Sequence, residues 1–197
     1  RDGTGVDARF YYPTGIALDG AGNIYVTEQH GYTIRKITPA GVVSTLAGTF
    51  RDPGSADGTG SSARFYYPCG IAVDSAGNVY VSEILNQTIR KITAGGVVTT
   101  IAGAAGVNGS TDGPGPVARF SNPADLAIDN TGNLYVADNL NSTIRKVVLG
   151  SSIRDIRVST FAGTAGVVGN TDGTGAAALF NGPYGLSVDG AGNIYVA

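Results

Sequence analysis

Apolar positions along the chain fall into short stretches that are separated by polar turns rich in glycine. Between residues 23 and 27, Ile24 and Val26 alternate with Asn23 and Tyr25, which is the period of a β-strand. The stretches at 16–19, 33–38 and 42–47 are equally short and contain many β-branched residues. Turn sequences such as DGAGN at 19–23 contain the Asp and Gly that tight hairpin connections require. The pattern therefore predicts four antiparallel strands in succession.

The same pattern of four strands returns along the whole chain. The sequence GIALDGAGNIYVTE at 15–28 recurs as GIAVDSAGNVYVSE at 70–83 and as DLAIDNTGNLYVAD at 125–138. A fourth copy, GLSVDGAGNIYVA, occupies 185–197. The block TIRK recurs at 33–36, 88–91 and 143–146, and VVSTLAG at 42–48 recurs as VVTTIAG at 97–103 and RVSTFAG at 157–163. Each copy is thus expected to be one structural unit.

A sheet of four short strands that is apolar on both faces must be covered on both sides by its neighbours. Radial repetition provides that cover, so we expect an all-β fold, a β-propeller of four-stranded antiparallel blades. The blades are expected at about residues 8–48, 63–103 and 118–163, with half of a fourth at 178–197. Propellers close with about four to eight blades. We therefore expect further blades to complete the ring, from the same longer protein or from another copy.

The motif P-x-G-[IL]-[AS]-[VIL]-D-x-x-G-N-[ILV]-Y-V-[ATS]-[DE], followed by T-I-R-K-[IV], resembles the NHL repeat. With DGTG and ARF before the blade, the copies are similar to the long NHL repeats of bacterial proteins. The resemblance covers nearly the whole chain, and it implies a propeller that serves mostly as an interaction scaffold. The resemblance also includes enzymes, such as the peptidylglycine-amidating lyases, which carry metal ligands on a similar scaffold. Some eukaryotic members bind RNA through a basic face.

Composition narrows the range of partners. Only 14% of the residues are charged and the net charge is −2, so nucleic acid is not an expected partner. No stretch reaches the about 20 apolar residues that cross a bilayer, so we expect no membrane insertion. The single cysteine, Cys69, stands where the first copy has Thr14 and is interpreted as a small packed residue. Few lysines, much Ser, Thr, Gly and Asn, and the resemblance favour an extracellular, periplasmic or cell-surface protein of bacterial type.

Candidate catalytic residues are few. His30 is the single histidine, and the equivalent loop positions hold Leu85 and Leu140. An imidazole metal site needs several such ligands, and no Ser-His-Asp signature is present. We therefore expect no catalytic residues, no metal and no cofactor. The motifs DGTG at 2–5, 57–60 and 172–175 and DGPG at 112–115 lack the further acids of a calcium loop and are interpreted as turns.

An acidic residue ends the second strand of each complete copy, and an arginine follows seven positions later in the third strand. The pairs are Glu28 with Arg35, Glu83 with Arg90, and Asp138 with Arg145. Opposite charges across one hairpin are close enough to pair, so a structural salt bridge in each blade is the favoured interpretation. The alternative is a ring of acids that binds a cation at the mouth of the channel.

Between the copies, ARFYYP at 8–13 and 63–68 returns as ARFSNP at 118–123 and ALFNGP at 178–183. The constant Ala, Phe and Pro are expected to belong to the scaffold, whereas the two residues before Pro vary. These positions emerge with the loops between the second and third strands on one face, which we call the loop face. The residues predicted to bind a ligand there are Tyr11, Tyr12, Gln29, His30, Tyr32, Tyr66, Tyr67, Asn86, Asn122, Asn139, Asn141 and Tyr184. Tyrosines with amides suit recognition of a protein or a carbohydrate. The alternative is that the tyrosines only cover the gaps between blades.

Together these features predict a non-enzymatic binding scaffold that recognises a protein or a glycan through its loop face. A first alternative is a structural subunit whose open half-blade is completed by another chain. A second alternative is a metal-dependent lyase or hydrolase whose ligands come from blades outside this sequence.

Overall fold

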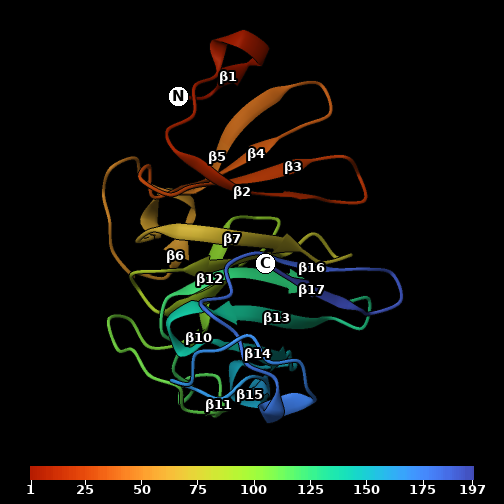
Figure 1. Cartoon of the computed structure of the whole chain (residues 1–197). Coiled ribbons are helices and arrows are strands. Elements are labelled where there is room, and N and C mark those ends of the chain that lie inside the picture. The colour runs from red at the N-terminus through yellow and green to blue at the C-terminus, as the bar shows by residue number, and fades with distance from the viewer.

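The computed structural model describes all 197 residues, from Arg1 to Ala197. The strands form three five-stranded antiparallel sheets and one two-stranded hairpin. The three sheets follow one another in sequence order and stack like the blades of a fan (Figure 1). The fold is therefore the all-β propeller architecture that the repeats predict. No helix of the structure has the length and apolar character needed to cross a membrane.

Each sheet has the same internal order, with the first long strand on the inside and a two-residue strand on the outer edge. The first sheet contains β1 (Gly3–Thr4), β2 (Pro13–Leu18), β3 (Ile24–Glu28), β4 (Thr33–Ile37) and β5 (Val42–Gly48). The second contains β6 (Gly58–Thr59), β7 (Pro68–Val73), β8 (Val79–Glu83), β9 (Thr88–Ile92) and β10 (Val97–Gly103). The third contains β11 (Gly113–Pro114), β12 (Pro123–Ile128), β13 (Asn133–Asp138), β14 (Thr143–Val148) and β15 (Arg157–Ala162). The hairpin contains β16 (Leu186–Val188) and β17 (Ile194–Val196), and the short 3-10 helices are η1 (Gly5–Asp7), η2 (Gly60–Ser62), η3 (Asn139–Asn141), η4 (Ile153–Asp155) and η5 (Gly175–Ala177).

The fifth strand of each sheet corrects the prediction of four. It comes from the DGTG or DGPG motif, which forms a strand at the sheet edge as well as a turn. Gly3 and Thr4 pair with Val43 and Val42, and the motifs at 57–60 and 112–115 pair in the same way with β10 and β15. The pairing places the Asp of the motif beside the arginine of the third long strand, at 2.7 Å for Asp2 and Arg35. These aspartates therefore belong to the scaffold.

The inner strands of successive sheets, β2, β7, β12 and β16, contact one another around a common axis (Figure 1). A hydroxyl group on the second strand joins neighbouring sheets there. Thr27 Oγ1 accepts a hydrogen bond from the Gly15 N–H at 2.8 Å and donates to the Cys69 carbonyl of the next sheet at 2.6 Å. Ser82 Oγ makes the same two bonds in the second sheet, to the Gly70 N–H and the Ala124 carbonyl. Glycine is required at Gly15 because a Cβ there would collide with the Cys69 carbonyl oxygen.

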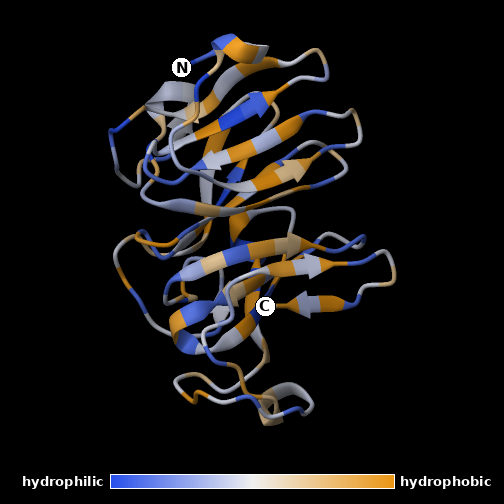
Figure 2. Cartoon of the chain, turned by 45° about the horizontal axis from the view of Figure 1, so that its top comes forward, coloured by the Kyte–Doolittle hydropathy of each residue, from blue (hydrophilic) through white to orange (hydrophobic).

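The core lies between the sheets, where the apolar positions of the strands meet (Figure 2). Phe65 and Phe120, from the repeated ARF blocks, are completely buried. Phe65 packs in a cluster that joins the first two sheets, and Phe120 in one that joins the second and third. Each phenylalanine thus fills the space between two blades, in agreement with the scaffold role of the constant residues.

Candidate functional site

A buried arginine at the centre of each sheet binds two carboxylates. Arg35 contacts Glu28 and Asp2 at 3.1 and 2.7 Å, Arg90 contacts Glu83 and Asp57 at 2.8 Å each, and Arg145 contacts Asp138 and Asp112 at 2.7 and 2.5 Å. The guanidinium groups also lie over the rings of the ARF phenylalanines, 5.2 Å from the centroid for Arg90 and Phe65. The six residues of the predicted salt bridges are therefore paired with each other inside the blades.

The acid of each pair also holds the loop that carries the variable residues. Glu28 Oε1 accepts the backbone N–H of Tyr11 at 2.6 Å, and Glu83 Oε1 accepts that of Tyr66 at 2.7 Å. In the third sheet the Asp138 carboxylate accepts the N–H of Ser121 at 2.6 Å. Burial raises the pKa of Glu83, and the charge of Arg90 opposes that shift. The buried network thus fixes the position of the loop face relative to the strands.

Aromatic side chains from the first two blades gather on the loop face. The rings of Tyr11 and Tyr12 are 5.0 Å apart, and His30 lies between Tyr12 and Tyr67 at 4.5 and 4.8 Å. Tyr66 and Tyr67 are 5.6 Å apart, and Tyr32 contacts both. Phe50, from the connection between the blades, packs on Tyr11 at 5.6 Å. We call this group the aromatic cluster: Tyr11, Tyr12, His30, Tyr32, Phe50, Tyr66 and Tyr67.

Arg51 lies at the edge of the aromatic cluster. Its guanidinium is 5.1 Å from the Tyr11 ring centroid and 5.8 Å from that of Phe50, and Nη2 donates to the Tyr11 hydroxyl at 3.0 Å. The carboxylate next to the cluster, Glu28, is buried and paired with Arg35. The surface of the aromatic cluster is therefore aromatic with one exposed cation beside it.

The backbone beneath the aromatic cluster is unusual. Tyr12, Tyr32, Tyr67 and Arg51 have φ values of 50°, 59°, 55° and 59°, in the left-handed region that large L-residues rarely adopt. In the other copies the equivalents of Tyr12 and Tyr67 are Asn122 and Gly182, and those of Arg51 are Gly106 and Gly166, all with positive φ as well. The left-handed geometry thus belongs to the repeat, whereas the bulky side chains belong to this part of the surface.

The predicted amide residues have other partners. The Asn86 side chain donates to the Gly54 carbonyl and to Glu83, and that of Asn141 donates to the Gly109 carbonyl and to Asp138, so both amides hold the connection between blades. Asn122 and Asn139 contact each other, and the Asn139 amide donates to the carbonyls at 182 and 183. Gln29 follows β3 on the loop face, and its backbone N–H donates to the Tyr12 carbonyl. These residues lie outside the aromatic cluster.

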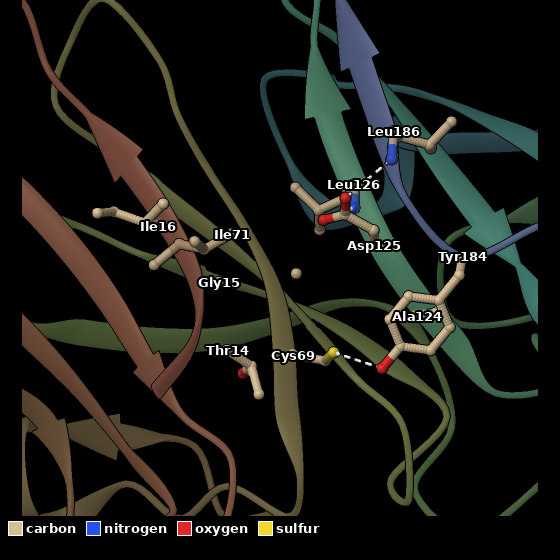
Figure 3. A pocket seen from close by; sticks show the side chains of 11 residues that line it. Thr14, Gly15, Ile16, Cys69, Ile71, Ala124, Asp125, Leu126, Tyr184 and Leu186 are labelled. Atoms are coloured by element: carbon tan, nitrogen blue, oxygen red, sulfur yellow. Dashed lines mark hydrogen bonds between the residues drawn. The ribbon is translucent and has the colours of Figure 1, made fainter. Parts of the chain in front are cut away.

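A cavity of about 410 Å³ lies on the axis, at the loop-face ends of the inner strands (Figure 3). One position per copy, the residue after the conserved proline, lines it with Thr14, Cys69, Ala124 and Tyr184. Because Ala124 is small, the Tyr184 hydroxyl reaches past it to within 3.5 Å of Cys69 Sγ. That hydrogen bond, with burial, raises the pKa of Tyr184 to about 12, and burial raises the pKa of the Cys69 thiol. Tyr184 is therefore an axial residue and lies apart from the aromatic cluster.

Asp125 is the charged side chain of the axial cavity. Its two carboxylate oxygens accept the backbone N–H groups of Leu126 and Leu186, at 2.8 and 2.9 Å. Figure 3 shows the carboxylate on the cavity side of β12. Burial raises its pKa, which the two hydrogen bonds oppose.

The sequence reasoning missed Asp125, Phe50 and Arg51. A comparison of the copies contains the signal for Asp125, because the equivalent positions hold Gly15, Gly70 and Gly185. The same comparison shows Arg51 where the other copies have glycine. Phe50 and Arg51 lie in the connection between blades, which has no apolar periodicity to mark them.

No group of three or more His, Cys, Asp and Glu side chains comes together in a geometry that could hold a metal ion. The His30 ring packs at a tilt between those of Tyr12 and Tyr67, with interplanar angles of 58° and 64°.

Comparisons with known proteins agree with the propeller class that the fold defines. The family model described as NHL repeat matches residues 120–147. Curated relatives include Protein SUPPRESSOR OF QUENCHING 1 of Arabidopsis thaliana (33% identity, 71% of this chain and 14% of the relative), human NHL repeat-containing protein 3 (28%, 59% and 30%) and mouse peptidyl-glycine alpha-amidating monooxygenase (31%, 77% and 15%). A solved Bacteroides thetaiotaomicron protein of unknown function superimposes with a TM-score of 0.76 at 26% identity, over 94% of this chain and 44% of that chain. The chain belongs to the NHL-repeat family of β-propellers.

The chain spans less than a third of the length of these curated relatives. One of them is named as a monooxygenase, so the family includes enzymes.

Proposed function

We propose that the chain is a non-enzymatic binding module that recognises a protein or a glycan through the aromatic cluster. The observation that carries this proposal is the convergence of Tyr12, Tyr32, Tyr67 and Arg51, all in left-handed backbone conformation, on one patch. Such a conformation costs a large side chain about 1–2 kcal/mol. Residues kept in sparsely populated conformations tend to cluster where function requires them.

The chemistry of the cluster suits recognition of a large, flat partner. Tyrosine and arginine give large contact areas and hydrogen-bonding groups, and they are enriched among the residues that dominate binding energies. The residue Tyr12 is 60% exposed, and neighbouring rings pack edge to face, at 77° for Tyr11 and Tyr12 and 79° for Tyr66 and Tyr67. This packing restrains the rings before a partner arrives, which lowers the entropy cost of binding.

The non-enzymatic part of the proposal is supported by the side chains present. Within residues 1–197 no three metal-ligating side chains converge, and the one histidine is engaged between two tyrosines. We also propose an exported or cell-surface location, which is supported by the low lysine content and the abundance of Ser, Thr, Gly and Asn.

The proposal is tested by replacing Tyr12 and Tyr67 with Asn, the residue that the third copy carries at this position. The wild type is first screened against an immobilised glycan panel and a displayed peptide library. We expect the double variant to lose at least tenfold in affinity for the selected probe, because two aromatic contacts of about 1 kcal/mol or more each are removed. Leu140→Ala, an exposed apolar loop residue of the third blade, is the matched control and should bind normally. Unchanged affinity of the double variant would reject the cluster as the site.

A further inference from the structure

We propose that the axial cavity binds an organic ammonium group, with the Asp125 carboxylate as its counter-ion. This site is separate from the aromatic cluster and goes beyond the proposed function. The ligand class is an alkylammonium, whose sources include a lysine side chain of another protein and a free amine such as an amino sugar.

The charge of Asp125 has no partner cation. The fully buried acids Glu83 and Asp138 each contact an arginine, whereas Asp125 receives two backbone N–H groups and no salt bridge. Each of its oxygens accepts one hydrogen bond and has a second lone pair, as a carboxylate has about four acceptor sites. A half-buried carboxylate without a cation is unfavourable, and a ligand cation would remove that penalty.

The propeller does not need this carboxylate to join its blades. In the first two sheets the same junction uses glycine with a hydroxyl on the second strand, Gly15 with Thr27 and Gly70 with Ser82. In the third sheet both positions differ, because Asp125 replaces the glycine and Ala137 replaces the hydroxyl residue. The carboxylate takes over the inter-blade contact through the Leu186 N–H and in addition brings a negative charge to the axis.

The shape and polarity of the cavity also favour an organic ammonium group. Apolar side chains line much of it: Ile16, Ile71, Leu126 and Leu186. The Tyr184 ring lies on the same cavity and offers a π-face, which attracts a desolvated cation. A hard metal ion requires about six oxygen ligands, whereas the side chains of this cavity provide one carboxylate and the hydroxyls of Thr14 and Tyr184. An ammonium group with an alkyl chain fits one negative charge, one aromatic ring and apolar walls.

The test uses the 197-residue chain labelled with ¹⁵N and titrated with n-butylammonium chloride, with sodium chloride at equal ionic strength as the reference. The backbone amides of Leu126 and Leu186 are the reporters, because both donate to Asp125. We expect saturable shifts of these two amides, and weaker binding as the pH falls toward the raised pKa of Asp125. No charged side chain of β2, β7 or β16 faces this carboxylate, and the neighbouring titratable groups are Cys69 and Tyr184.

The decisive variant is Asp125→Gly with Ala137→Ser, which gives the third sheet the junction of the second. It removes the charge but keeps the blade contact, so it is expected to fold and to lose at least tenfold in affinity for n-butylammonium. Asp125→Asn tests the charge at constant shape and should lose a similar factor. Asp7→Asn, an exposed acid without a side-chain hydrogen bond, is the control and should titrate like wild type.

Equal titration of the wild type and the double variant would overturn the proposal, and so would the absence of saturable shifts in the wild type. A saturable response to Ca²⁺ that n-butylammonium does not compete with would overturn it in favour of a metal site. Glucosamine and N-acetyl-lysine amide distinguish the sources, and tighter binding of either supports the ammonium assignment. Tyr12→Asn should leave the titration unchanged, so failure here and failure of the aromatic cluster are independent results.

Discussion

At the scale of single residues, backbone strain is recognised by comparing equivalent positions of the four copies. The residue before the conserved proline has a φ of 50° in Tyr12, 55° in Tyr67, 61° in Asn122 and 60° in Gly182. Glycine and asparagine adopt this conformation at little cost, whereas tyrosine does so only with strain. The first two blades therefore carry a residue that is worse for the fold than the one in the later blades. A surface role for the aromatic ring accounts for that choice.

Tyr12→Asn should therefore raise the free energy of unfolding by about 1 kcal/mol, because Asn tolerates the left-handed region. Little packing is lost in exchange, since the Tyr12 side chain is 60% exposed. Urea denaturation followed by circular dichroism measures the change. Asn122→Tyr is the reciprocal variant and should destabilise the chain by a similar amount. A loss of stability in Tyr12→Asn would show that the ring serves mainly to cover the gap between blades.

At the scale of the elements, the buried arginine network determines how each blade supports its loops. Glu83 accepts four hydrogen bonds, from the Tyr66 N–H, Asn86, Thr88 and Arg90, and its side chain is completely buried. Asp57, the residue before edge strand β6, binds the same arginine, but its side chain is 47% exposed. The two acids thus make similar contacts at very different depths. Their depth, more than the number of contacts, should decide what each contributes.

We expect Glu83→Gln to lower the free energy of unfolding by about 3 kcal/mol, because the buried guanidinium of Arg90 loses its buried counter-charge and keeps only the half-exposed Asp57. Asp57→Asn should cost about 1 kcal/mol, since water screens the pair at the surface. Chemical denaturation of both variants gives the two values. In Glu83→Gln the amide signals of Tyr66 and Asn86 should also shift, because the Glu83 carboxylate accepts a hydrogen bond from each of these two residues. Equal costs for the two variants would contradict the importance of depth.

The strands that the sequence predicts are the ones with a local signal. The stretches at 33–38 and 42–47 match β4 (Thr33–Ile37) and β5 (Val42–Gly48) within a residue, because their apolar periodicity is repeated three times. The edge strand β1 was missed because Gly3–Thr4 has no apolar pattern, and its partner lies about forty residues later. Its presence depends on the pairing of Asp2 with Arg35, which no local pattern reveals.

The candidate site was predictable only where the copies differ within a recognised motif. The Tyr-Tyr pairs are predicted in that way, as residues that vary inside the constant ARF and Pro frame. Asn86 is buried and bonded to Gly54 and Glu83, which its place in a loop of the sequence does not reveal. Asp125 was missed because its significance requires two facts at once, the replaced glycine and the missing hydroxyl at Ala137, which only the folded junction connects.

At the scale of the whole molecule, burial is uneven along the series of sheets. The inner strand of the first sheet exposes Ile16 and Leu18, at 71% and 65%, whereas the equivalent Ile71 in the second sheet is buried. Strand β8 is buried along its whole length, and β13 nearly so. The hairpin of β16 and β17 has two strands and no fully buried residue. Because each blade packs mainly against its neighbours, stability should follow this distribution of burial.

Native-state hydrogen exchange should therefore reveal a gradient of amide protection along the series of sheets. Amides of β8, β9, β13 and β14 should exchange most slowly, because these central strands are hydrogen-bonded on both sides and lie in the two core clusters. Amides of β16 and β17 should exchange fastest among the strands, since a two-stranded hairpin that packs on one neighbouring sheet has little stability of its own. The first sheet should lie between them, with β2 less protected than β7 because of its exposed inner face. Occupation of the axial cavity by an ammonium ligand should slow exchange of the Leu186 amide in particular, because binding would stabilise the junction of β12 with β16. Uniform protection across all four units would instead mean that the sheets unfold as one cooperative body, and that the contacts along the axis are stronger than their burial indicates.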